Sequence, residues 1–127
     1  MLIRYKKSFE KIAMGLLSFM PEEKEVKKLQ STIKEYENNP DWHLFLWKEE
    51  DILGAVGIRF ENQVNVIVQH ITVNPSHRNM GIGRKMVQGI KEMYAEKYAV
   101  CSNDMTERFL DKCQDTEEGK DGTSLES

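Results

Sequence analysis

The 127-residue sequence predicts a single α/β domain, α+β in type, in which helices cover both faces of a mixed central sheet. Two amphipathic helical patterns come before three strands that are rich in β-branched and aromatic residues. The third of these strands, residues 64–73, is apolar on both faces, which is typical of a strand inside a sheet covered on both sides. A helix and a further strand follow it, and such crossovers usually join parallel neighbours.

The first forty residues predict a strand and two helices. Residues 2–5 form a short apolar run, and Ser8 can cap the helix that follows by accepting from its free N–H groups. Pro21 ends that helix and, with Glu22 and Glu23, suits the first turn of a second helix. The second helix carries a narrow apolar stripe on a charged surface that we expect to be solvated, and the stripe consists of Val26, Leu29, Ile33 and Tyr36.

Three strands are predicted in the middle of the chain, over residues 42–48, 52–60 and 64–73. Their connectors, 49–51 and 61–63, are short and polar, so the strands are expected to form an antiparallel meander. Trp42 and Trp47 are five residues apart on the first strand and therefore face opposite sides of the sheet. At least one of the two indoles should belong to the core.

The last third of the chain predicts a helix, a strand and a final helix. A strong apolar stripe covers residues 82–94, and residues 98–102 have the pattern of a strand parallel to the last strand of the meander. Asn103 or Asp104 can cap the final helix, and Glu107 completes a capping-box spacing from Asp104. The apolar side of this helix is expected to consist of Met105, Phe109, Leu110 and Cys113.

Composition separates a domain, residues 1–113, from an acidic tail, residues 114–127, that we expect to be disordered. The tail holds five acids and one lysine, so the body carries about +1 of the net charge of −3. This body lacks the basic field of a nucleic-acid binder, and no apolar run approaches the roughly 20 residues of a membrane span. Cys101 and Cys113 match no metal-ligand spacing. Without a signal-peptide pattern, we expect a reduced, cytoplasmic protein with no metal, nucleic-acid or membrane partner.

The stretch from Val73 to Gly83 reads VNPSHRNMGIG and joins the meander to the following helix. Its RNMGIG part places two glycines and a row of backbone N–H groups at a helix start, an arrangement that holds a phosphate or pyrophosphate. No Gly-Lys-Ser/Thr follows at the spacing of a P-loop. Met86 stands where a dinucleotide fingerprint has its third glycine. The sequence therefore predicts a seat for a phosphorylated cofactor of another kind.

The strand, V-x-P, R-x-x-G-x-G and amphipathic helix together resemble the acetyl-CoA-binding motif of the GNAT family of N-acetyltransferases, and the order of elements over residues 2–113 resembles the family fold. The resemblance implies acetyl-CoA as cofactor. It implies a pyrophosphate loop that begins at Arg78, with the backbone N–H groups of Asn79, Met80, Gly81, Ile82, Gly83 and Arg84 as donors. It also implies that main-chain groups of Ile71 and Val73 meet the pantetheine arm and the acetyl carbonyl, and that Asn103 contacts the cofactor.

Two departures from the family pattern concern the end of the chain. Many members carry a Phe-Tyr pair on the last helix, whose tyrosine protonates the leaving CoA thiolate, whereas this chain has Phe109-Leu110 there. The family's final strand pair would follow Cys113, and residues 114–127 cannot supply it. Either the fold is trimmed or a second copy covers the gap, which leaves a homodimer open. Because those strands commonly line the acceptor side, the sequence does not identify the acceptor.

The activity implied by the resemblance is transfer of an acetyl group from acetyl-CoA to a primary amine of a small molecule or peptide, by direct attack in a ternary complex. The alternative is a CoA-binding regulatory or assembly protein with little or no transferase activity. Transfer needs a general base, because an ammonium must lose a proton before its nitrogen can attack.

Two residues are candidates for moving protons. His70 is the sharpest, since unperturbed histidine titrates at about pH 6.5. The alternative for His70 is a core histidine with a satisfied partner, on one strand face with Val64, Val66 and Val68. Tyr98 could substitute for the missing acid, or simply pack at the start of its strand.

Overall fold

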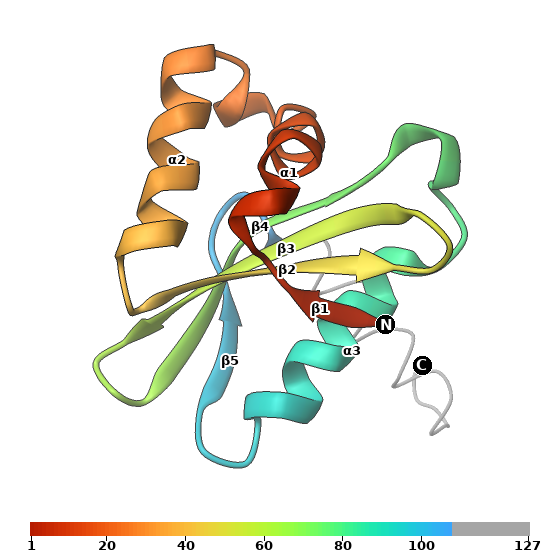
Figure 1. Cartoon of the computed structure of the whole chain (residues 1–127). Coiled ribbons are helices and arrows are strands. Elements are labelled where there is room, and N and C mark those ends of the chain that lie inside the picture. The colour runs from red at the N-terminus through yellow and green to blue at the C-terminus, as the bar shows by residue number, and fades with distance from the viewer. Residues whose placement is uncertain (108–127) are drawn as a thin grey trace.

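The computed structural model describes residues 1–107, which form a five-stranded sheet with the order β1-β2-β3-β4-β5 (Figure 1). The strands β1 to β4 are antiparallel neighbours, and β5 runs parallel to β4. This confirms the predicted meander and the predicted parallel crossover. The strand bounds are β1 (Leu2–Arg4), β2 (Trp42–Lys48), β3 (Ile52–Glu61), β4 (Asn65–Val73) and β5 (Ala99–Ser102).

Helices cover both faces of this sheet, as predicted. The helices α1 (Glu10–Leu17) and α2 (Val26–Asn38) lie on one face, and α3 (Ile82–Tyr94) lies on the other (Figure 1). Each face therefore has its own hydrophobic core, one beneath α1 and α2 and one beneath α3. Trp42 packs against the first core and Trp47 against the second, which confirms that the two indoles face opposite sides.

The helix starts in the first forty residues differ from the prediction. Ser8 lies in a short 3-10 helix, η1 (Lys7–Phe9), and α1 begins after it without a side-chain cap, so Ser8 is not the predicted cap. A second 3-10 helix, η2 (Pro21–Glu23), stands apart from α2, which begins at Val26. Because η2 turns inward, Glu23 is completely buried and does not join a solvated helix surface.

A β-bulge at Gln69 reverses the side-chain pattern of β4. Gly57 of β3 pairs with His70, but the next residue, Ile58, pairs with Val68, so Gln69 has no partner on β3. Since side chains alternate along a strand, one extra residue moves those beyond it to the other face. Val68 therefore lies in the α3-side core, whereas His70 contacts α2 and η2. The expectation that His70 shares a face with the preceding valines is wrong.

Candidate active site

The loop between β4 and α3 has a backbone conformation that suits an anion. Asn79 and Gly81 have left-handed φ angles of +67° and +80°, and Gly81 occupies the N-cap position of α3. The first N–H with a main-chain acceptor after this turn is that of Lys85, which bonds to the carbonyl of Gly81 at 3.0 Å. Within the described residues, the N–H groups of residues 79–84 have no acceptor. We call this set of donors the phosphate seat.

Two sets of contacts fix the start of the loop. The side chain of Asn74 accepts a hydrogen bond from the backbone N–H of Ser76 at 3.0 Å. Arg78 donates from Nε to the carbonyl of Val73 at 3.2 Å, and its guanidinium lies 5.9 Å from the ring centre of Phe19. The loop is therefore attached both to the end of β4 and to the segment that follows α1.

The strands β4 and β5 separate beside the phosphate seat. Their paired residues end with Val68 and Ser102, although β4 continues for five more residues. Asn74 donates its N–H to a carbonyl of β3, so the alternation of an antiparallel ladder directs the main-chain groups of Ile71 and Val73 toward the other edge. Within the described residues, this edge of β4 has no strand beside it, although the Val73 carbonyl already accepts a hydrogen bond from Arg78.

Asn103 lies at the point where the two strands separate. Its Nδ2 donates to the carbonyl of Gln69 at 3.4 Å. Its Oδ1 accepts from the N–H groups of Met105 and Thr106, at 2.9 and 3.0 Å. The structure thus chooses Asn103 over Asp104 as the residue that caps the following turn, and it ties that turn to the bulge of β4.

His70 is held at both ring nitrogens, on the face of the sheet that α1 and α2 cover. Its Nε2 lies 3.1 Å from Oε2 of Glu23, and its Nδ1 lies 2.7 Å from Oη of Tyr36. Gln69 donates from Nε2 to the same Tyr36 hydroxyl at 3.0 Å. All four side chains are buried. We call Glu23, Tyr36, Gln69 and His70 the buried network.

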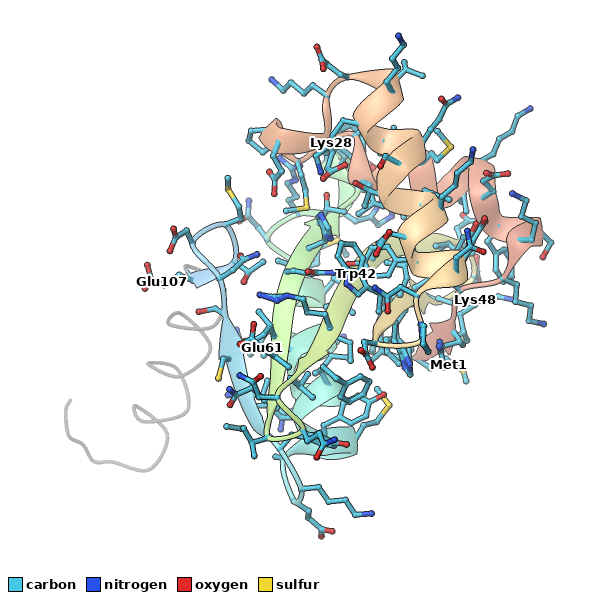
Figure 2. The ribbon with its side chains drawn as sticks, turned by 90° about the vertical axis from the view of Figure 1, so that its left-hand side faces the viewer. Met1, Lys28, Trp42, Lys48, Glu61 and Glu107 are labelled. Carbon is cyan, nitrogen blue, oxygen red and sulfur yellow. The ribbon has the colours of Figure 1, made fainter. Side chains whose placement is uncertain are left out.

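Glu23 supplies a negative charge to the buried network. Burial raises the pKa of this carboxyl group, but hydrogen bonds from His70, Thr32 and Lys28 outweigh burial and lower the pKa to about 2. Thr32 donates to Oε1 at 2.7 Å, and the Lys28 ammonium lies 3.1 Å from Oε2. Because the Lys28 side chain is half exposed, it connects the buried carboxylate to solvent (Figure 2).

The Tyr36 hydroxyl fits because residue 57 is a glycine. A Cβ on Gly57 would overlap the hydroxyl and the ring of Tyr36. The Trp42 ring lies 5.0 Å from the Tyr36 ring and 6.5 Å from the His70 ring, and it is only partly buried (Figure 2). Burial raises the pKa of Tyr36, so its hydroxyl stays protonated at neutral pH.

The structure does not bring Tyr98 together with His70. Tyr98 packs 5.2 Å from the Phe60 ring and 6.2 Å from the Tyr94 ring, at the margin of the α3-side core. His70 faces the opposite side of the sheet, so the packing alternative describes Tyr98 better. Phe109, Leu110 and Cys113, and with them the expected last helix and the acidic tail, lie outside the described residues.

Sequence reasoning missed Glu23, Tyr36 and Gln69 as parts of a site. Glu23 is predicted to begin a solvated helix, and Tyr36 is predicted as one member of an apolar stripe. The signal in the sequence is His70 itself, since a histidine within an apolar strand needs polar partners when it is buried. That signal predicts that partners exist without saying which residues they are.

Two features that would indicate other kinds of site are absent from residues 1–107. Among residues 1–107, no three His, Cys, Asp or Glu side chains are grouped so that they could hold a metal ion. In the described range, no helix has the length and apolar character needed to cross a membrane.

Comparison with known proteins identifies the class. The family model described as "Acetyltransferase (GNAT) family" matches residues 9–113, and the chain belongs to this family. A Bacillus methanolicus protein described as an uncharacterized N-acetyltransferase in the lysA 3' region is 56% identical over 115 residues, which cover 90% of this chain and 95% of the relative. The N-acetyltransferase class is thus supported for the chain as a whole.

Solved structures share the fold at low sequence identity. A GNAT family acetyltransferase of Staphylococcus aureus matches with a TM-score of 0.66 at 21% identity, covering 82% of this chain and 85% of that chain. The aminoglycoside N-acetyltransferase AAC(6')-Iy, solved in complex with CoA, matches with a TM-score of 0.68 at 13% identity, covering 98% and 87%. These matches confirm the predicted fold class, a mixed sheet with helices on both faces.

Proposed function

We propose that this chain binds acetyl-CoA and transfers the acetyl group to a primary amine by direct attack within a ternary complex. The observation that carries the proposal is the phosphate seat, whose free N–H groups lie beside the open edge of β4. The cofactor pyrophosphate would accept hydrogen bonds from the N–H groups of residues 79–84 in the loop that begins at Arg78. Solved relatives with the same fold that hold CoA support this choice of anion.

The open edge of β4 would hold the remaining length of the cofactor. Main-chain groups of Ile71 and Val73 would bond the pantetheine arm, and a backbone N–H at this edge would polarise the acetyl carbonyl. Asn103 would contact the cofactor where β4 and β5 separate. The protein would then contribute mainly by positioning the thioester carbon against the amine nitrogen. His70 would supply the base, since the attacking nitrogen must first lose a proton.

A second candidate function is a CoA-binding regulator with little or no transferase activity. The observation that favours it is the burial of His70, whose two ring nitrogens are already hydrogen-bonded. Such a protein would keep the phosphate seat and use the buried network only to join α2 and η2 to the sheet.

A narrower proposal concerns the biological setting. The PEEK and GIGRKM stretches resemble RibT, the acetyltransferase-like protein that some bacilli encode with their riboflavin-synthesis genes. We therefore propose a cytoplasmic role in a riboflavin operon, supported by this overall likeness alone. The acceptor would be a small-molecule or peptide amine, as in the solved aminoglycoside acetyltransferases of the same fold.

Calorimetry and a thiol-release assay test the two functions. Titration with CoA should give saturable binding, and no heat at millimolar CoA would remove both candidates. Thiol release from acetyl-CoA with spermidine, kanamycin and a lysine-containing peptide should then identify an acceptor. His70→Ala should lower that turnover at least 100-fold, as loss of a general base does, without weakening CoA binding. Binding without turnover of any amine would favour the regulator.

A further inference from the structure

The ionised carboxylate of Glu23 determines which ring nitrogen of His70 carries the proton. A carboxylate only accepts hydrogen bonds, so His70 must present an N–H from Nε2 to Glu23. In the neutral imidazole, Nδ1 is then the acceptor, and the hydroxyl that lies 2.7 Å away on Tyr36 is its donor. Neither nitrogen is left for an incoming amine, so His70 cannot take a proton from a substrate directly.

Hydrogen bonds run from Glu23 through His70 to the Tyr36 hydroxyl, and we call these three groups the relay. The Tyr36 hydroxyl is its outer member. Its proton goes to His70, and one of its two lone pairs accepts from Gln69. One lone pair therefore has no hydrogen-bond partner among the described residues, and Tyr36 itself is 6% exposed. The nearest partly exposed ring, that of Trp42, packs 5.0 Å from the Tyr36 ring and presents an aromatic surface suited to an ammonium.

We propose that Tyr36 is the catalytic residue that takes the proton of the acceptor amine, and that His70 and Glu23 are positioning residues behind it. This inference rests on the proposed acetyl transfer and names the atom through which His70 acts. Burial raises the pKa of Tyr36 and keeps its phenol protonated, so Tyr36 transfers a proton to His70 and is not a phenolate before the reaction.

The proton balance of the reaction is as follows. The acceptor ammonium gives one proton to Oη of Tyr36 while the Tyr36 proton moves to Nδ1 of His70, which becomes an imidazolium beside the Glu23 carboxylate. The freed amine nitrogen attacks the thioester carbon, the C–N bond forms and the C–S bond breaks. The second nitrogen proton goes to the CoA thiolate. The imidazolium then returns its proton to solvent, and the neutral relay is restored.

The charges around the relay come from three elements. Glu23 belongs to η2, and Lys28 on α2 bonds to it with a side chain that reaches solvent. Arg59 of β3 acts on Tyr36 through its charge and also forms an ion pair with Glu61 at 3.3 Å. Glu23 is thus the negative group in direct contact with His70, and it would stabilise the imidazolium.

Tyr36→Phe removes the relay hydroxyl and keeps the ring. With spermidine, kanamycin and the lysine-containing peptide as probes, kcat for any amine that is turned over should fall at least 100-fold, while KM for acetyl-CoA stays within twofold. The matched control is Tyr5→Phe, which also removes a tyrosine hydroxyl bonded to α2, through the partly buried Glu37 at 2.7 Å. Tyr5→Phe should keep kcat within twofold.

Glu23→Gln tests the positioning role through the separate effects on kcat and KM. Without the carboxylate, the imidazolium formed in the transfer loses its counter-charge, so kcat should fall while KM for acetyl-CoA stays within twofold. A residue that only supports the fold would change both constants. Nitrogen-15 NMR of His70 gives a reading that needs no acceptor, since wild-type protein should show the Nε2–H tautomer.

The outcomes separate the relay from the proposed function. Wild-type turnover that Tyr36→Phe reduces by less than threefold, or an Nδ1–H tautomer of His70, would overturn the relay and leave acetyl transfer standing. CoA binding without turnover of any of the three amines would overturn both, because the relay would have no reaction to serve. A 100-fold loss in Tyr36→Phe, with Tyr5→Phe unchanged, would support both.

Discussion

The phosphate seat and the buried network are constructed in opposite ways. The seat uses main-chain groups of six consecutive residues, and its shape depends on the left-handed backbone of Asn79 and Gly81. The network uses side chains from η2, α2 and β4, and its longest contact joins residues 47 positions apart. The seat is therefore sensitive to bulk at one position, whereas the network is sensitive to the loss of a single functional group.

Gly81→Trp should have the largest effect, and it should affect the seat alone. Nothing lies within 4 Å of a Cβ at this position, so an indole would occupy the space in front of the N–H donors. The positive φ of Gly81 adds backbone strain to any side chain. Calorimetry with CoA should show no measurable binding, while the His70 NMR signals stay as in the wild type. Retained CoA affinity would place the cofactor elsewhere.

Glu23→Gln should have the next largest effect, and it should change how stability depends on pH. The pKa of Glu23 is about 2 in the folded chain and 4.5 without its partners, so the unfolded chain binds the proton first as the pH falls. The resulting stabilisation is complete above pH 4.5 and is lost as the pH falls toward 2.

Denaturant unfolding at several pH values measures this loss. Between pH 4.5 and 2 the wild type should lose about 2–3 kcal/mol more than Glu23→Gln does. Glu35→Gln is a suitable control, because that exposed carboxylate bonds only to Asn39 among the described residues. Equal pH dependence of wild type and Glu23→Gln would show that the carboxylate is not held as described.

Gly57→Ala should have the smallest effect on stability and still disturb the network. The new methyl group would displace the Tyr36 hydroxyl from His70 without changing any titratable group. Overpacking of this kind costs about 1–2 kcal/mol in the free energy of unfolding. Turnover should fall by more than the stability change explains, and CoA affinity should persist.

The matched control for this substitution is Gly15→Ala. A Cβ at Gly15 meets nothing within 4 Å, and the residue lies inside α1, so alanine should stabilise the protein by about 0.5–1 kcal/mol. Turnover of Gly57→Ala at the wild-type level would show that the position of the Tyr36 hydroxyl does not matter.

The contrast between the two features also explains what the sequence could predict. The phosphate seat is visible because its strand, turn and helix are adjacent, and because glycine at position 81 permits the left-handed turn. The order of strands and helices is visible because each follows from local periodicity. The cap of the last turn could be narrowed to Asn103 or Asp104, because a capping residue is identified by its near neighbours, but only the hydrogen bonds of Asn103 decide between the two.

The buried network could not be predicted in this way. Glu23 reads as a surface residue because glutamates near a proline usually start helices, and only the packing of η2 against β4 buries it. Tyr36 has the spacing of an apolar stripe, which describes its ring and says nothing of its hydroxyl. His70 could be chosen but not oriented, since its direction depends on the unpaired Gln69.

The unpaired Gln69 changes which residues of β4 face the α3-side core. Before it, the residues that enter the α3-side core are even-numbered, Val66 and Val68; after it they are odd-numbered, Ile71 and Val73. A strand of uniform alternation could not bury both pairs in one core. Deleting Gln69 would therefore leave every catalytic side chain in the sequence and still put half of β4 out of phase. A switch from even-numbered to odd-numbered apolar residues within one strand is thus a sequence pattern that can indicate a β-bulge of this kind in other proteins.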